Sequence, residues 1–311
     1  MSALSFSDTK VSIHRPRTAV VVSTYNGACH IDAQLDSILA QDLKPDLVIV
    51  RDDGSSDDTV TLLREYVLKG EIQLIEGQNL GVVGSFLSVL SEVPSDIDYV
   101  FLSDQDDVWH SDKISRAVSC LEEIGQAKPC YYCAEYTFCD AQMNRGERSH
   151  LLRGEVDFAH MLFENPTSGN TCALNRPLLE LVLRGGSLDV YCHDWWMGLV
   201  ASALGTVVHD DFDSLDYRRT GSNASPTGMG FFQLLRYRLL TFFKKGEFSK
   251  ISKQLKRLYD LYADNMSASN REILYRFTCG NRFMKAFMPI RLRQKLIDDI
   301  VLRVLFMFGF L

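Results

Sequence analysis

Apolar segments typical of buried strands alternate with helical patterns four times within about the first hundred residues. The expected strands are 18–23, 47–50, 72–75 and 99–102, and the expected helices between them are 30–40, 59–66 and 84–90. Strands and helices that alternate in this way specify a parallel sheet with helices on both faces. We therefore expect an α/β fold with a Rossmann-like, mostly parallel sheet flanked by helices.

Three of the predicted strands end in polar loops, two of them rich in acids. These loops are Thr24-Tyr-Asn26, Asp52-Asp53 and Asp104-Gln-Asp106. In open α/β sheets, ligands bind beyond the carboxyl ends of the strands. The three loops should therefore converge on one edge of the sheet, where we expect the functional site.

The most specific chemical signal is a set of three carboxylates within four residues, Asp104, Asp106 and Asp107. Carboxylates this close together repel one another unless a cation lies between them. Hard oxygen ligands suit Mg²⁺ or Mn²⁺, which proteins often share with substrate phosphates. The alternative for Asp107 is a helix cap, because a helix is expected from 109 to 124.

The pair Asp52-Asp53 also has two interpretations. A carboxylate at a strand end can accept hydrogen bonds from a nucleobase N–H or from ribose hydroxyls, or it can cap the next helix. Asp57 and Asp58 are better placed to cap the helix that follows, so we expect Asp52 and Asp53 to bind a ligand.

The chain resembles the amino-terminal half of the family 2 glycosyltransferases in the order and spacing of four motifs. These motifs are Thr24-Tyr-Asn26, Asp53-Gly-Ser55, Asn79-Leu-Gly81 and Asp104-Gln-Asp106. The segments 103–109 and 217–223 further resemble the bacterial rhamnosyltransferase branch. The resemblance covers roughly residues 17–223 and is clearest up to about 114. It implies a GT-A fold and an inverting transfer of sugar from a nucleoside-diphosphate donor.

The resemblance also implies roles on the donor side of the site. Asp53 would read the nucleobase, Asp104 would lie near the ribose, and Asp106 would hold the Mg²⁺ or Mn²⁺ that bridges the diphosphate. The full set implied to bind the nucleotide is Thr24, Tyr25, Asn26, Asp52, Asp53 and Asp104. Thr220 stands where related sequences often have a histidine that approaches the diphosphate, so Arg218 or Arg219 is expected to make that contact instead.

The acceptor side is expected at His193-Asp-Trp-Trp196, which occupies the place where the family carries its general base. Asp194 would then remove the proton from the attacking hydroxyl. Trp195 or Trp196 would line the acceptor pocket, and His193 would be a further contact. The alternative is a helix start with a capping acid and two core tryptophans.

Together these features predict an inverting enzyme that transfers rhamnose or another deoxyhexose from a dTDP- or UDP-sugar. The expected acceptor is a hydroxyl of a growing bacterial surface polysaccharide such as O-antigen, carried on a lipid. One rival is a sugar nucleotidyltransferase, but the loop 24–29 lacks the Lys or Arg that would hold a triphosphate. The other is a nucleic-acid-binding module, but the basic end of the chain has no recognition motif.

Charge divides the chain into two expected parts, a catalytic domain over 1–227 and a basic, amphipathic helical region over 228–311. The second part holds 16 Lys and Arg against 6 Asp and Glu, whereas the net charge of the whole chain is −7. Segment 231–245 mixes Phe and Leu with Lys and Arg, and the apolar end 304–311 follows a basic cluster at 291–295. We expect peripheral binding to the inner face of the cell membrane. The alternatives are packing on the catalytic domain and a homodimer contact.

The compartment expected from the sequence is the cytoplasm. Eight irregularly spaced cysteines do not form a disulfide pattern, and residues 1–10 lack the basic start and apolar core of a secretory signal. No apolar run approaches the ~18 residues that a spanning helix requires.

Overall fold

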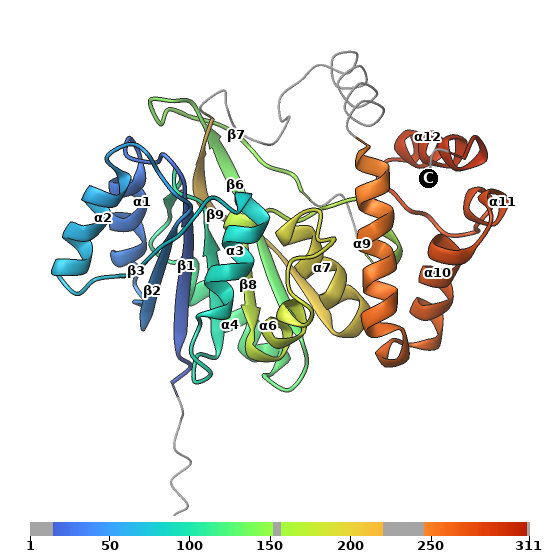
Figure 1. Cartoon of the computed structure of the whole chain (residues 1–311), viewed down its shortest axis with the longest axis horizontal. Coiled ribbons are helices and arrows are strands. Elements are labelled where there is room, and N and C mark those ends of the chain that lie inside the picture. Colours follow the sequence, from blue (N-terminus) through green and yellow to red (C-terminus); the bar gives the residue numbers. More distant parts are fainter. Residues whose placement is uncertain (1–14, 152–156, 220–245, 310–311) are drawn as a thin grey trace, which may run out of the picture.

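The structure is a computed structural model that describes residues 15–151, 157–219 and 246–309. Its centre is a nine-stranded mixed sheet in the order β3-β2-β1-β4-β8-β6-β9-β5, with β7 beside β6 (Figure 1). The first four strands are parallel: β1 (Thr18–Thr24), β2 (Leu47–Asp52), β3 (Gln73–Glu76) and β4 (Tyr99–Ser103). Their carboxyl ends therefore lie at one edge of the sheet, as the alternation of strands and helices predicted.

The second half of the sheet is more mixed in direction. Its strands are β5 (Val108–Trp109), β6 (Cys130–Cys139), β7 (Arg145–Arg148), β8 (Ala173–Asn175) and β9 (Thr206–Arg218). β8 is antiparallel to both β4 and β6, whereas β9 runs parallel to β6 and antiparallel to β5.

Helices cover both faces of the sheet. α1 (Ile31–Leu39), α2 (Thr59–Leu68) and α4 (Lys113–Ile124) pack on one face, and α3 (Gly81–Ser91), α6 (Arg176–Leu183) and α7 (His193–Leu204) pack on the other. Alternate side chains of a strand point to opposite faces. Val20 and Val22 accordingly join the first of these cores, and Ala19 and Val21 join the second.

Helices also follow the sheet, as expected for the end of the chain. They are α9 (Glu247–Tyr262), α10 (Ala268–Cys279), α11 (Arg282–Ala286) and α12 (Leu296–Met307). Their buried side chains belong to the same hydrophobic core as α3, α6 and α7. The described helices of this region therefore pack on the catalytic half. The expected boundary at 227, the segment 231–245 and Thr220 lie outside the described residues.

Two of the expected helix starts are wrong. The helix expected from 109 begins at Lys113, because Val108 and Trp109 pair with β9 as a short strand. The helix expected from 84 begins at Gly81. β9 is one long strand, whose pairing with β6 shifts register near Glu135. In the part of the chain that the structure describes, no helix is both long and apolar enough to cross a bilayer.

Candidate active site

Carboxylates from two distant parts of the chain meet at the carboxyl edge of the sheet. Asp104, Asp106 and Asp107 lie in the connection from β4 to β5, and Asp194 lies in the first turn of α7. Burial raises the pKa of Asp104 well above its ordinary value, and repulsion from Asp107, Asp106 and Asp194 adds to the increase. The expected general base thus lies within electrostatic reach of the expected metal site.

The side chains fit a hard divalent cation. Neither Asp104 nor Asp106 accepts a hydrogen bond from another side chain in the described part of the chain. Their oxygens are therefore available to Mg²⁺ or Mn²⁺. Burial raises the pKa of Asp106, and electrostatic interactions with His30 and Arg218 oppose that shift.

Asp107 has a different role from its two neighbours. Its carboxylate accepts hydrogen bonds from Nδ2 of Asn170 at 2.6 Å and from the backbone N–H of Arg218 at 3.3 Å, and only 1% of the residue is exposed. It does not cap α4, whose N-cap is Asp112. Asp107 therefore joins the β4–β5 connection to β9 and to the loop that contains Asn170.

A buried cation lies behind the acidic cluster. Lys113, in the first turn of α4, is 1% exposed, donates a hydrogen bond to the carbonyl of Asn170, and has its Nζ 3.6 Å from the centre of the Trp109 ring. Burial lowers the pKa of Lys113 to about 7, although Asp107 and Asp104 favour its charged form. Lys113 could not be predicted as a site residue, because nothing in the local sequence pattern distinguishes a buried lysine from an exposed one.

The buried Asp107 predicts a pH dependence of stability. Burial, with repulsion from Asp106, raises its pKa from 3.8 to about 7. Between these values the folded state binds more protons than the unfolded state, so stability falls as the pH rises. One pKa unit corresponds to about 1.4 kcal/mol, so relative to Asp107→Asn the wild type should lose on the order of 2–4 kcal/mol between pH 4 and 7. Urea unfolding of metal-free protein at several pH values measures the difference, and parallel pH profiles would contradict it.

On the donor side, the middle residue of the Asp104-Gln-Asp106 motif joins two loops. Oε1 of Gln105 accepts hydrogen bonds from Oγ1 of Thr24 and from the backbone N–H of Tyr25, both at 2.7 Å. A Cβ at Gly27 would lie 2.6 Å from the same oxygen, so a larger residue there would displace the Gln105 side chain from this position. Sequence analysis gave Gln105 no role, because its partners lie 80 and 81 residues away.

The residues expected to wrap the nucleobase differ in how accessible they are. Tyr25 is 48% exposed and can stack on a base, whereas the buried hydroxyl of Thr24 is used by Gln105. Asn26 has a φ of +52°, a left-handed conformation that asparagine tolerates. It links this loop to the next, since its N–H donates to Oγ of Ser55 and its Oδ1 accepts from the N–H of Ser56.

Asp52 and Asp53 are almost completely buried and already have protein partners. Asp52 accepts hydrogen bonds from the N–H groups of Gly54 and Ser55. Asp53 forms an ion pair with Arg51 and accepts from the first N–H groups of α3. Both residues thus hold the loops at the sheet edge, and their contact with a nucleotide stays a prediction.

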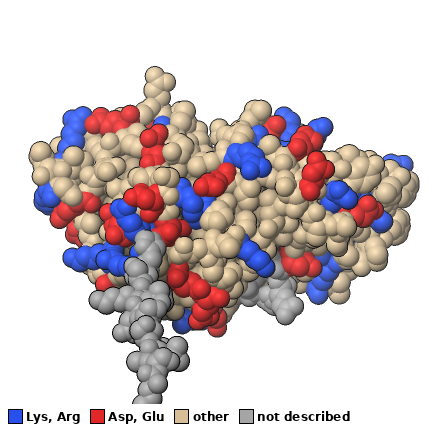
Figure 2. Space-filling model, turned by 90° about the horizontal axis from the view of Figure 1, so that it is seen from below, with Lys and Arg blue, Asp and Glu red and all other residues tan. Residues whose placement is uncertain are grey.

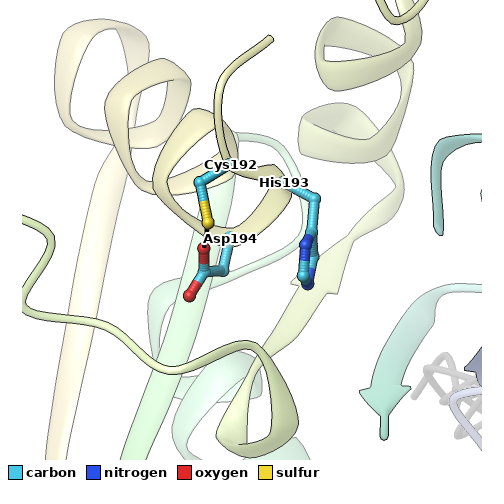
Figure 3. Close-up of side chains that lie close together, drawn as sticks. All are labelled: Cys192, His193 and Asp194. Carbon is cyan, nitrogen blue, oxygen red and sulfur yellow. Dashed lines mark hydrogen bonds between the residues drawn. The ribbon is translucent and has the colours of Figure 1, made fainter. Parts of the chain in front are cut away.

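On the acceptor side, three donors hold the carboxylate of Asp194. Sγ of Cys192 lies 2.8 Å from Oδ1, the backbone N–H of Trp195 lies 2.7 Å from the same oxygen, and Nδ2 of Asn165 lies 3.0 Å from Oδ2. Figure 3 shows the sulfur and the carboxylate facing each other at the start of α7, with the imidazole of His193 apart from them. Burial and the nearby Asp194 raise the pKa of Cys192, so its thiol stays protonated and can donate.

The loop 165–171 connects the acceptor side to the acidic cluster. Its first residue, Asn165, donates to Asp194, and Asn170 donates to Asp107 while its carbonyl accepts from Lys113. Nothing in the sequence of this segment marks it as functional. Its Asn-rich composition is typical of turns, and the partners of both asparagines lie far away in the sequence.

His193 and the two tryptophans that follow Asp194 are core residues. Trp196 is completely buried and donates from Nε1 to the carbonyl of Val182, and Trp195 is 6% exposed and donates to the carbonyl of Met161. Both tryptophans therefore pack in the core, as the alternative interpretation expected, and a contact of either one with the acceptor stays a prediction. The ring of His193 stacks on Phe86 at 4.2 Å, and burial lowers its pKa.

The two arginines expected near the diphosphate both reach this region. Nε of Arg218 donates to the carbonyl of Asp106 at 3.0 Å, and Nη1 donates to the carbonyl of Ala141. This guanidinium therefore helps to hold the connection from β4 to β5 in place. The guanidinium of Arg219 lies 3.6 Å from the centre of the Phe138 ring. Their contact with a diphosphate stays a prediction.

Known proteins share sequence with this chain over part of its length. The chain is 27% identical over 187 residues to the dTDP-rhamnosyl transferase RfbG of Shigella flexneri, which covers 57% of this chain and 63% of that protein. It spans 42% of the length of an uncharacterised glycosyltransferase of Rickettsia prowazekii, with 32% identity over 143 residues. The chain thus spans less than two thirds of the length of these relatives.

Solved structures share the fold at low identity. Residues 1–349 of S. aureus TarS superpose with a TM-score of 0.54 at 16% identity, covering 87% of this chain and 82% of that one. The mannosyltransferase PcManGT from Pyrobaculum calidifontis, solved with GDP-Man and Mn²⁺, gives 0.54 at 17% identity, covering 94% and 75%. The fold is therefore the GT-A-like α/β fold that the motifs predicted. The family model for glycosyl transferase family 2 matches residues 19–179. Because this match covers more than half of the sequence, the chain belongs to glycosyl transferase family 2.

Proposed function

We propose that this protein is an inverting glycosyltransferase that moves a sugar from a nucleoside diphosphate to a hydroxyl of a growing glycan. The observation that carries the proposal is the position of Asp194 beside Asp104, Asp106 and Asp107. With substrate bound, the base would serve the acceptor hydroxyl and the cation would serve the departing diphosphate.

The chemistry follows from these side chains. Asp194 takes the proton of the acceptor hydroxyl as that oxygen attacks the anomeric carbon, and its hydrogen bonds from Cys192 and Asn165 keep the carboxylate in place. Asp106, with Asp104, would hold the Mg²⁺ or Mn²⁺, which supplies positive charge to the departing diphosphate. Attack opposite the leaving group inverts the configuration of the anomeric carbon.

The donor that we propose is a dTDP- or UDP-linked sugar, with rhamnose or another deoxyhexose as the sugar. The name of the Shigella relative supports this choice. The acceptor proposed is a lipid-linked bacterial surface polysaccharide such as O-antigen. The reaction would then take place at the cytoplasmic face of the cell membrane.

The rival functions have less support. Membership in glycosyl transferase family 2 argues against a sugar nucleotidyltransferase. A nucleic-acid-binding module would need a continuous basic stripe. On the face seen in Figure 2, the described Lys and Arg residues are interspersed with Asp and Glu.

Ligand-induced stabilisation tests the proposal. In the presence of Mn²⁺, dTDP or UDP should raise the melting temperature, because a ligand at about 100 times its Kd stabilises the folded state by about 2.7 kcal/mol. The matched nucleoside without phosphates serves as the control and should give a much smaller shift. If no nucleoside diphosphate raises the melting temperature with Mn²⁺, the proposed function is wrong.

A further inference from the structure

The last two described helices expose an unusually apolar surface. α12 buries Leu302 and Phe306 against the protein core, where Phe306 packs on Phe163 and Phe277. Large apolar side chains on the rest of α11 and α12, and just after each helix, are each at least 40% exposed. They are Phe283, Met284, Phe287, Leu296, Ile297, Ile300, Val301, Val304, Met307 and Phe308, which we call the α11–α12 face. Clustered exposure on this scale marks an interaction surface.

A groove of about 580 Å³ runs along this face, and Phe287, Met288, Ile300 and Val304 are among its lining residues. Contacts made by one ion pair fix the shape of this groove. Arg303 forms an ion pair with the buried Asp299 and donates hydrogen bonds to the carbonyls of Ala286, Met288 and Ile290. These contacts hold the α11–α12 connection in place, so the exposed apolar side chains lie on a fixed support.

The charge around the face is positive. Residues 280–309 contain six Lys and Arg but only two Asp, of which Asp299 is buried in its pair with Arg303. Arg282, Arg291 and Lys295 are exposed. Apolar side chains bordered by exposed cations match an anionic lipid surface, where the apolar groups enter the interface and the cations meet the headgroups.

The face is joined closely to the acceptor side of the active site. Arg293 donates to the carbonyl of Phe163, and the backbone N–H of Gln294 donates to Oε2 of Glu164 at 2.7 Å. The next residue, Asn165, holds the carboxylate of Asp194. A bilayer bound at α11–α12 would therefore lie against the part of the molecule that supports the general base.

We propose that the α11–α12 face docks on the surface of an anionic bilayer and brings the acceptor side of the site to lipid-linked substrate. The docking is argued from the exposed apolar side chains and the cations around them. That it brings the site to lipid-linked substrate rests on the proposed transferase function. The expected membrane segment 304–311 overlaps the end of this face, and the expected segment 231–245 lies outside the described residues. The proposed contact extends further back along the chain, to side chains of α11.

Vesicle flotation of the full chain tests the docking. Vesicles of phosphatidylcholine alone are compared with vesicles of equal parts phosphatidylcholine and phosphatidylglycerol, at low and high salt. Wild-type protein should float with the anionic vesicles at low salt and be released by high salt. The double variant Ile297→Glu with Ile300→Glu should reduce the floated fraction at least tenfold, and Arg291→Glu with Lys295→Glu should act in the same direction.

Leu68→Glu and Leu188→Glu are the matched controls, because both leucines are highly exposed on other elements. They should float like the wild type. The proposal is wrong if the wild type stays unbound at low salt, or if Ile297→Glu with Ile300→Glu floats normally. A third outcome would also contradict it: the wild type does not float, light scattering shows that it is a dimer, and Ile297→Glu with Ile300→Glu is a monomer. The α11–α12 face would then bind a second copy of the chain. Stabilisation by dTDP or UDP in the same variant reports separately on the transferase proposal.

Discussion

The substitution Asp106→Asn is expected to abolish sugar transfer and to remove metal-dependent donor binding. The carboxamide keeps the volume of the side chain but loses its charge and one oxygen acceptor. Asp106 accepts no hydrogen bond from another described side chain, so its oxygens are available to the metal that we propose. Loss of electrostatic stabilisation at a leaving group typically costs ~10²–10³-fold in rate. Turnover measured across Mn²⁺ concentrations, and calorimetry of nucleotide binding with and without Mn²⁺, check the expectation.

Asp112→Asn is the matched control for this substitution. Asp112 lies six residues further along the same segment, is exposed, and makes no side-chain capping bond although it is the N-cap of α4. The same loss of charge at Asp112 should leave turnover and metal dependence unchanged. Wild-type rates for Asp106→Asn at every Mn²⁺ concentration would show that the metal assignment is wrong.

The half of the sheet that carries the donor side could be predicted from sequence because its signals are local. β1 and β4 are short apolar runs flanked by polar turns, and each parallel strand places its following loop at the same edge. The convergence of the loops after Thr24, Asp52 and Ser103 therefore needed no knowledge of tertiary contacts. The antiparallel β8 is only three residues long, and the register of β9 with β6 is irregular, so these strands have weaker local signals.

The residues that hold the site together could not be predicted, because each acts through a partner far away in the chain. Gln105 reaches the loop after β1, Asn165 reaches Asp194, and Asn170 reaches Asp107 across 63 residues. A single sequence contains no periodicity that records such pairs. Glutamine and asparagine in loops also have an ordinary explanation as turn residues.

The tryptophans of α7 show what the local sequence pattern cannot predict on the acceptor side. Every residue from His193 to Ala201 is buried. A helix that is buried on all sides has no polar face, so the pattern does not indicate which side chains point toward a ligand. On α12 the sequence does not show which side is buried, because apolar residues occupy both its buried and its exposed sides. Only the packed structure shows that Phe306 is buried and Ile297 is exposed.

Asp194→Asn is expected to leave nucleotide affinity nearly unchanged while lowering kcat by ~10²-fold or more, the usual contribution of a general base. The nucleotide is expected at the loops after β1 and β2, whereas Asp194 lies on α7 on the acceptor side. An asparagine can still accept from Asn165 or Cys192, so the loop geometry should persist. Asp189→Asn is the control, because Asp189 is exposed and its positive φ of 56° suits asparagine. Calorimetry with dTDP or UDP and steady-state kinetics separate the effects. Lost donor binding with a preserved rate would make Asp194 a structural residue rather than the base.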